Sequence, residues 1–226
     1  MSKKESETCY MCVAPKVSRE HVPPKCLFPE QKDLPAGMDY RKNLIKVPSC
    51  KVHNLNTSDH DEYLMAVLVW HFKNNGAAYN HAATKVLRAL KRRDGALATT
   101  ILQDAQSVSV RGQQTVKLKI DTERVIGELD KIARGLHFKH YNEKWTDELL
   151  VYPPSMQNEN AQINIIHEEL LRKNRQTFQN VPRHGENQEI FYYQFLEENG
   201  DKALRMVFYE GFEAVAIPKE SLKKHV

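Results

Sequence analysis

The sequence predicts an α+β protein in two parts: a small N-terminal module, residues 1–75, and a mixed α+β domain with antiparallel strands, residues 76–226. Three observations predict this class. Residues 1–57 are rich in proline and show little helical periodicity, amphipathic patterns of helical period follow them, and alternating apolar runs end the chain. The boundary is expected at the Asn-Asn-Gly of residues 74–76, where a helical pattern ends.

The first part is expected to form short extended segments and loops, because prolines interrupt residues 1–57 repeatedly. A segment of this size buries too little apolar surface to fold unaided, so it needs a further source of stability. A helix is then expected to begin at Ser58, an N-cap residue followed by the acidic side chains of Asp61 and Glu62. The apolar run of residues 63–72 would form the body of that helix.

The middle of the chain predicts two helices and a hairpin between them. Residues 77–95 are strongly helical in pattern, with an apolar stripe along one face. Residues 107–121 alternate between apolar and polar side chains and predict a β-hairpin. Residues 122–136 predict a second amphipathic helix. His137 and His140 follow it and are expected to be ordinary helix-end or core histidines rather than metal ligands.

The last third of the chain predicts strands around one further helix. Residues 148–154 are expected to form a strand and residues 164–176 a helix. Residues 189–218 alternate in the manner of two or three antiparallel strands, with a turn at Asn199-Gly200. The C-terminal part is therefore expected to be α+β.

The composition is that of an ordinary soluble globular protein, with 41% hydrophobic and 27% charged residues. The longest apolar run, residues 63–72, is about half the roughly 20 residues needed to cross a bilayer. Residues 1–8 lack the apolar core of a signal peptide. A cytoplasmic protein without membrane association is therefore expected. Because cytosolic thiols stay reduced, the cysteines are expected to be metal ligands or buried thiols rather than disulfides.

The net charge of +4 is unevenly distributed. Residues 76–140 are basic in balance and residues 141–226 are acidic, which predicts a surface for polyanions in the middle of the chain. An ordinary solvated helix face is the alternative interpretation. The residues expected to contact the phosphates of a nucleic acid are Lys85, Arg88, Lys91, Arg92 and Arg93.

Two pairs of potential metal ligands frame the N-terminal module. Two residues separate Cys9 from Cys12, and two separate Cys50 from His53. Zn²⁺ prefers four sulfur and nitrogen ligands in a tetrahedron, and structural zinc contributes roughly 10–16 kcal/mol in small peptides. A zinc ion would therefore explain how so short a segment folds. Cys26 in place of His53 is an alternative fourth ligand. A redox Cys-x-x-Cys is a further alternative, although no βαβ unit surrounds the motif.

An acid–base pair, Glu20-His21, lies between these two ligand pairs, shortly before two prolines. Histidine has an unperturbed pKa of about 6.5, which suits it to accept a proton near neutral pH. A neighbouring carboxylate suits a hard divalent cation such as Mg²⁺. A lone Glu-His is usually a surface feature. Its position between the two ligand pairs, followed by Asn43 and Asn54, favours a functional site.

Together these stretches resemble the HNH endonuclease motif of the ββα-metal fold. The motif combines Cys-x-x-Cys, an Asp/Glu-His pair with a nearby proline, Asn-Leu, Cys-x-x-Cys/His and a final His or Asn. The corresponding stretches here are CYMC, SREHVPP and KNLIKVPSCKVHN, so that the match covers roughly residues 9–60, about a quarter of the chain. The longer pattern is similar to stand-alone bacterial HNH nucleases with a Glu-His-Val-Pro-Pro sequence, some of them associated with phage defence.

The resemblance implies a role for each matched residue. His21 would be the general base, Asn43 would hold the loop of His21, and Glu20 and Asn54 would ligate a catalytic Mg²⁺ or Mn²⁺. The ligands of a structural Zn²⁺ would be Cys9, Cys12, Cys50 and His53. The chain departs from the commonest pattern in two places, because Asn54 stands in place of the final histidine and Glu20 in place of aspartate.

The function that the resemblance implies is metal-dependent hydrolysis of phosphodiester bonds, in DNA rather than RNA. One alternative is the nuclease subunit of an anti-phage defence complex that is inactive without a partner such as an ATPase. Another is a non-cleaving, zinc-dependent module that binds nucleic acid or protein. The presence of Glu20, His21, Asn43 and Asn54 favours cleavage, because a scaffold needs only the zinc ligands. Residues 76–226 would position the substrate or bind a partner.

Overall fold

The N-terminal part of the molecule is built on a two-stranded antiparallel sheet. The computed structural model describes residues 7–54, 58–110 and 113–223. Strand β1 (Ser18–His21) pairs with β2 (Lys46–Ser49), with Ser18 opposite Ser49 and His21 opposite Lys46. Two 3-10 turns, η1 (Lys25–Leu27) and η2 (Gln31–Asp33), lie between the strands. These short strands and turns agree with the extended segments and loops expected for this part of the chain.

Two helices complete the N-terminal part: α1 (Lys51–Asn54) and α2 (Ser58–Val69). Helix α2 begins at Ser58, as predicted, but it ends at Val69 rather than continuing to residue 72. The side chain of Asn74 donates hydrogen bonds to the carbonyls of Leu68 and Val69 at 2.7 and 3.1 Å, which ends the helix. Seven consecutive residues at its C-terminal end are buried, so α2 lies inside the molecule rather than on its surface.

The predicted continuous helix over residues 77–95 is helical as far as Leu90 and is wrong beyond it. The structure has α3 (Gly76–His81), a π-helical turn η3 (Ala82–Val86), α4 (Leu87–Leu90), a 3-10 turn η4 (Arg93–Gly95) and α5 (Ala96–Leu102). The backbone becomes left-handed at Arg93 and Asp94, with φ of 50° and 52°, and this breaks the helical pattern. Helix α5 was not predicted.

The hairpin predicted in the middle of the chain is confirmed, with β3 (Gln106–Val110) antiparallel to β4 (Gln113–Lys117). Helix α6 (Thr122–Tyr141) follows and begins where the sequence predicts. Its N-cap is Asp121, whose side chain accepts a hydrogen bond from the backbone of Arg124 at 3.0 Å. The helix runs beyond the predicted end to Tyr141, where Asn142 adopts the left-handed conformation with φ of 58°.

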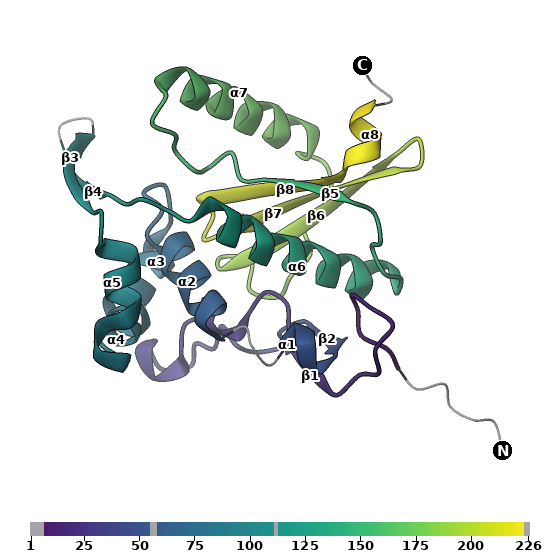
Figure 1. The fold of residues 1–226 in the computed structure, drawn as a ribbon, viewed down its shortest axis with the longest axis horizontal. Helices are drawn as coiled ribbons and strands as arrows, with labels where there is room; N and C mark the ends of the chain where they lie inside the picture. Colours follow the sequence, from purple (N-terminus) through teal and green to yellow (C-terminus); the bar gives the residue numbers. More distant parts are fainter. Residues whose placement is uncertain (1–6, 55–57, 111–112, 224–226) are drawn as a thin grey trace.

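A four-stranded antiparallel sheet forms the C-terminal part. Its elements are β5 (Leu149–Tyr152), α7 (Ala161–Thr177), β6 (Phe191–Glu198), β7 (Asp201–Phe208), β8 (Phe212–Pro218) and α8 (Lys219–Lys223). The strand order is β5-β8-β7-β6, and the predicted turn between β6 and β7 lies at Asn199-Gly200. Helix α6 runs along one side of the sheet, between it and the β1–β2 pair, and α7 lies on the opposite side (Figure 1).

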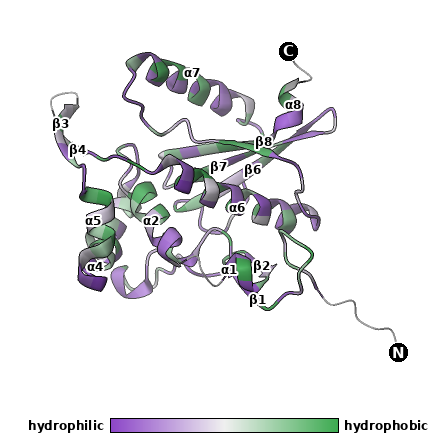
Figure 2. Ribbon diagram, viewed as in Figure 1, coloured by the Kyte–Doolittle hydropathy of each residue, from purple (hydrophilic) through white to green (hydrophobic). Residues whose placement is uncertain are grey.

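The core joins the two predicted parts. One cluster of buried apolar residues extends from Cys9 in the N-terminal part to Ala216 in β8, and it includes α2, α6 and the strands of the large sheet. Apolar colour is concentrated in the same elements (Figure 2). Residues on both sides of residue 75 therefore share buried surface, and α2 lies in the middle of it.

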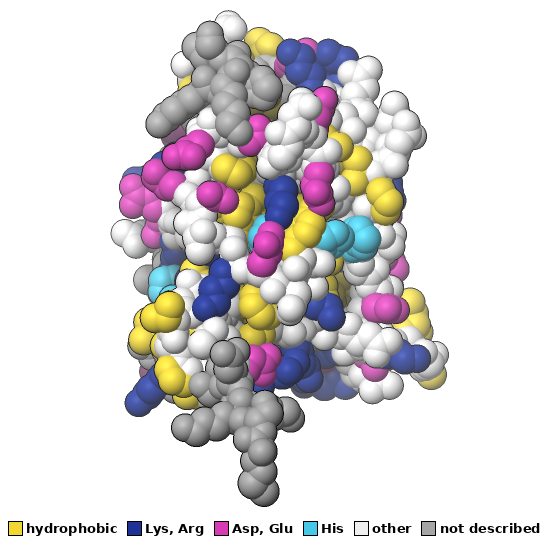
Figure 3. Space-filling model, turned by 90° about the vertical axis from the view of Figure 1, so that its right-hand side faces the viewer, with side chains coloured by type: hydrophobic (Ala, Val, Ile, Leu, Met, Phe, Trp, Pro, Cys, Tyr) yellow, Lys and Arg dark blue, Asp and Glu magenta, His cyan; other side chains and the backbone are white. Residues whose placement is uncertain are grey.

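The surface carries charges of both signs. On the face shown in Figure 3, acidic and basic side chains are interspersed with apolar ones, and histidines lie near the middle. Of the helices in the described part of the chain, none has the length and apolar character needed to span a membrane.

Candidate metal centre and catalytic cavity

Cys9, Cys12, Cys50 and His53 form one cluster whose ligand atoms all lie within 4.8 Å of one another. The three distances from His53 Nδ1 to the sulfurs of Cys9, Cys12 and Cys50 are 3.3, 3.6 and 3.3 Å. Cys12 Sγ lies 3.8 Å from Cys50 Sγ. A tetrahedron with Zn–S bonds of about 2.3 Å and Zn–N bonds of about 2.0 Å has edges of about 3.8 Å between sulfurs and about 3.5 Å between sulfur and nitrogen. The donor set and its spacing therefore fit a structural metal site.

Two loops bring these ligands together. The first is closed by a hydrogen bond from Cys9 N to Ala14 O at 2.9 Å and is joined to β2 by one from Tyr10 N to Pro48 O at 2.8 Å. The second loop supplies Cys50 at the end of β2 and His53 in α1. Lys144, after α6, donates to Cys12 O at 2.8 Å and so ties the first loop to the C-terminal part.

Cys26 lies outside this cluster. Its thiol donates to the carbonyl of Asp61 in α2 at 3.3 Å, and burial raises its pKa to about 12. The alternative in which Cys26 replaces His53 is therefore not the arrangement that the structure shows. Cys26 is a neutral thiol packed against α2.

A separate cavity of about 230 Å³ brings together three of the residues that the HNH resemblance assigns to catalysis. Glu20 and His21 reach it from β1, and Asn54 from the end of α1. The other lining residues are Arg19, Pro24, Lys25, Cys26, Ser58, Asp61 and Glu62. The cavity therefore combines a histidine, carboxylates and an amide, which are the groups needed for proton transfer and for binding of a hard cation.

Glu20 is half-buried beside other charged groups. Burial raises its pKa to about 7, and the neighbouring Glu128 of α6 acts in the same direction. Lys131 and a hydrogen bond from Ser49 Oγ, 3.1 Å from Glu20 Oε2, act against this rise. The carboxyl group therefore titrates near neutrality, and a bound cation would favour its charged form.

His21 is partly buried among positively charged side chains. Burial lowers its pKa, and Lys46, Lys25 and Arg41 lower it further. Its imidazole is therefore neutral at pH 7, which is the form that a general base requires.

Asn54 and Asn43 lie in different surroundings. Asn54 Nδ2 donates to Ser18 Oγ at the start of β1, which places the amide beside the strand that carries Glu20. Asn43 is exposed, with a left-handed φ of 53°, and in the described part of the chain no hydrogen bond joins it to the His21 strand. That strand is extended instead by a backbone bond from Val22 N to Ile45 O at 3.0 Å.

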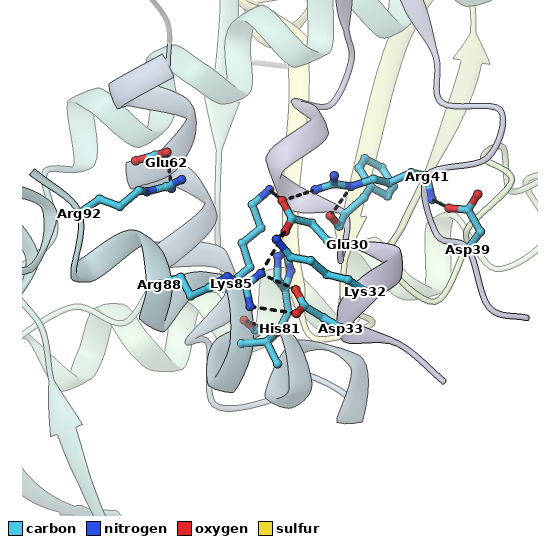
Figure 4. A network of polar contacts seen from close by, with 12 residues as sticks. Glu30, Lys32, Asp33, Asp39, Arg41, Glu62, His81, Lys85, Arg88 and Arg92 are labelled. Atoms are coloured by element: carbon cyan, nitrogen blue, oxygen red, sulfur yellow. Dashed lines mark hydrogen bonds and ion pairs between the residues drawn. The ribbon is translucent and has the colours of Figure 1, made fainter. Parts of the chain in front are cut away.

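The basic residues expected to contact nucleic acid are mostly engaged in ion pairs within the molecule (Figure 4). Lys85 lies 3.1 Å from Glu30, and Arg88 lies 3.0 Å from Glu30 and 2.6 Å from Asp33. Arg92 pairs with Glu62 at 2.6 Å, and Arg93 pairs with Asp59. Lys91 is exposed and has no ion pair among the residues that the structure describes. The four paired side chains join this segment of the chain to the N-terminal part.

His137 and His140 are an ordinary core residue and an ordinary helix-end residue, as expected. His137 is buried and stacks on Trp145, with ring centroids 4.7 Å apart. His140 is exposed in the last turn of α6, with its ring centroid 4.8 Å from that of His184.

Several cavity residues were not singled out from the sequence as parts of the site. Asp61 and Glu62 were interpreted only as first-turn residues of a helix. Arg19 lies two positions before His21, and side chains two apart on a strand share one face, so this spacing was an available signal. No local signal points to Ser49, because its contact with Glu20 depends on the pairing of β1 with β2.

Comparison of the chain with family models, with curated proteins and with solved structures finds no match.

Proposed function

We propose that this protein is a metal-dependent HNH-type endonuclease that hydrolyses phosphodiester bonds in DNA. The observation that carries the proposal is one cavity lined by Glu20, His21 and Asn54, beside a separate Cys/His cluster. The cluster offers the sulfur and nitrogen ligands that Zn²⁺ prefers, whereas the cavity offers the oxygen ligands that suit Mg²⁺ or Mn²⁺. Two metals of different chemistry can therefore bind a few residues apart without competing for ligands.

Each group of residues would have its own part in the reaction. The Cys/His cluster, with zinc bound, would hold the loop before β1 against α1 and so fix the strand that carries Glu20 and His21. Glu20 and Asn54 would hold the divalent cation, which supplies positive charge to stabilise the phosphate and the leaving oxygen. Neutral His21 would take a proton from the attacking water as the water oxygen bonds to phosphorus and the P–O ester bond breaks.

The metal ligands are tested by cleavage of supercoiled plasmid DNA with added Mg²⁺ or Mn²⁺. We expect the wild-type protein to cut only when one of these ions is added, and Glu20→Gln and Asn54→Ala to need more of it or to lose activity. Zinc content should be unchanged in both variants. His140→Ala, which replaces an exposed histidine outside the cavity, is the matched control and should cut at the wild-type rate.

Other outcomes would favour the alternative functions. A zinc-containing protein that binds DNA but cuts under none of these conditions would support a non-cleaving binding module. Cleavage that begins only after addition of a partner such as an ATPase would support a subunit of a defence complex. Cleavage of equal rate in the wild-type protein and both variants would contradict the assignment of the cavity.

A further inference from the structure

Three cationic side chains lie near His21, and two of them line the candidate cavity. Arg19 and His21 lie two positions apart on β1, so they share a face of the strand, and both line the cavity. Lys25 lines it from the turn that follows Pro24. Lys46 lies directly opposite His21 in the β1–β2 register. We refer to Arg19, Lys25 and Lys46 as the cationic rim.

The rim residues are weakly engaged within the molecule. Among the residues that the structure describes, the carboxylate paired with Arg19 is that of Glu7, at 3.6 Å, and 53% of the Arg19 side chain is exposed. Lys25 and Lys46 are exposed, and neither forms an ion pair with any residue in the described ranges. By contrast, Lys85, Arg88 and Arg92 form ion pairs at 3.1 Å or less. The rim is therefore the set of cations near the cavity that is available to an external anion.

Side chains of both charge signs line the cavity, with Glu20 on β1 beside Arg19. The acidic side chains of Asp61 and Glu62 come from the first turns of α2, whereas the rim comes from β1, β2 and η1. The rim charges act on the site itself, because Lys46 and Lys25 both help to lower the pKa of His21. A phosphodiester bound with a divalent cation needs both signs, with carboxylates beside the cation and positive charges beside the phosphate oxygens.

We propose that Arg19, Lys25 and Lys46 bind the phosphates of the DNA backbone on either side of the bond that is cut. The ion-paired residues Lys85, Arg88, Arg92 and Arg93 instead hold their helical segments against the N-terminal part. This proposal rests on the proposed endonuclease function. It moves the DNA contact from α4 and η4, where the sequence places it, to the strand that carries the general base.

Salt-dependent binding distinguishes the two surfaces. A fluorescently labelled DNA duplex of about 20 base pairs is titrated with protein over a range of salt concentrations, in a His21→Ala background so that the duplex stays intact. Each phosphate contact contributes about 0.9 to the slope of log affinity against log salt. Replacing all three rim residues with alanine should lower the slope by about 2 to 3 and weaken binding at least tenfold at moderate salt. The control removes the same number of charges: Lys91→Ala, Arg92→Ala and Arg93→Ala together should change the slope by less than 1.

The outcomes separate this proposal from the proposed function. If the control variant loses more slope than the rim variant while the wild-type protein cuts DNA, the rim assignment is wrong and the endonuclease stands. If the wild-type protein neither binds nor cuts DNA with any divalent cation, both fail. Zinc content and thermal unfolding of each variant confirm that it is folded. As a second test, Arg19→Lys should retain most of the slope that Arg19→Ala loses, because a role in packing would not depend on charge alone.

Discussion

The pKa values of two neighbouring residues of β1 are shifted in opposite directions. Glu20 lies near Ser49, Glu128 and Lys131, and burial raises its pKa to about 7. His21 lies near lysines and an arginine, and its pKa is lowered. The largest cause of both shifts is burial, which disfavours the charged form and so raises the pKa of a carboxyl group and lowers that of an imidazole. One dipeptide therefore supplies both a carboxyl group that a cation can deprotonate and an imidazole that is neutral at pH 7.

Two cysteines of this chain should respond differently to the same substitution. Cys9→Ser removes a sulfur ligand from the tetrahedral cluster, so we expect loss of zinc and unfolding of the N-terminal part. Cys26→Ser changes a thiol that only donates to the carbonyl of Asp61, so zinc should remain bound. Zinc content and circular dichroism check both variants. Equal zinc content in the two would contradict the cluster as a metal site.

A buried histidine should make stability depend on pH. Burial lowers the pKa of His81 to about 3, its Nδ1 lies 2.9 Å from Tyr209 Oη, and its buried Nε2 has no hydrogen-bond partner in the described structure. The unfolded chain therefore binds more protons between about pH 6.5 and pH 3, and the free energy of unfolding falls as pH decreases through that range. In His81→Gln this contribution should disappear, which makes the pH dependence shallower by up to about 1.4 kcal/mol per pH unit. Urea unfolding of both proteins at pH 6 and pH 5 measures the difference. If the free energy of unfolding changes equally with pH in the wild-type protein and in His81→Gln, the pKa of His81 is not lowered by folding.

At the scale of elements, α6 holds the strand that carries the candidate site. A Cβ added at Gly135 would lie 2.7 Å from Val22 Cγ2, so glycine lets the helix approach the residue that follows His21. Val22 is buried and β-branched, and it cannot easily turn away. The position of His21 therefore depends on a helix that begins a hundred residues later in the chain.

Two glycines of α6 provide a matched pair of variants. Gly127→Ala meets no heavy atom within 4 Å, so better helix propensity should raise the free energy of unfolding by up to about 1 kcal/mol. Gly135→Ala gains the same propensity but overlaps Val22, and we expect a net loss of about 1–3 kcal/mol, with reduced DNA cleavage. Chemical denaturation measures both. Similar stabilisation by the two substitutions would show that α6 does not constrain β1.

Local sequence signals predicted that a helix or turn exists, and where it begins, better than they predicted where a helix ends. Ser58, Asp121 and Asn199-Gly200 each carry a cap or turn signal, and α2, α6 and the β6–β7 turn lie where these signals place them. The break at Arg93 and Asp94 was missed, although Asp94-Gly95 is a dipeptide typical of turns and aspartate is enriched among residues with a left-handed backbone. The spacing of the ligand pairs predicted the metal cluster but left His53 and Cys26 as alternatives for the fourth ligand, and the structure brings His53 to Cys9, Cys12 and Cys50.

At the scale of the whole molecule, the charges of one part neutralise those of the other. Glu30 and Asp33 lie beside Lys85 and Arg88, and interaction with Lys32 and then Lys85 lowers the pKa of Glu30 to about 2. A charge count along the sequence cannot show such pairing, because the partners are more than fifty residues apart. For this reason the basic middle of the chain suggested a surface for polyanions, whereas in the structure Lys85, Arg88, Arg92 and Arg93 form ion pairs with acidic residues of the N-terminal part.

The shared core should make the chain unfold in one step. Helix α2 is buried among residues from both predicted parts, and Lys144 joins the C-terminal part to the loop that carries Cys9 and Cys12. Zinc release and the fluorescence of Trp145 and Trp70 should therefore follow one urea transition with a common midpoint. A chromophoric chelator reports the zinc and fluorescence reports the tryptophans. Two separate midpoints would show that residues 1–75 unfold independently.

The central claim is that His21 lies where a phosphodiester bond is cut. The most direct measurement is the rate of plasmid cleavage by wild-type protein and by His21→Ala, with equal zinc content and the same Mg²⁺ or Mn²⁺ concentration. Loss of a general base typically costs about 10²–10⁴-fold in rate, so His21→Ala should cut at least about a hundredfold more slowly while it remains folded. A folded His21→Ala protein that cuts at the wild-type rate would contradict the assignment of this cavity as the active site.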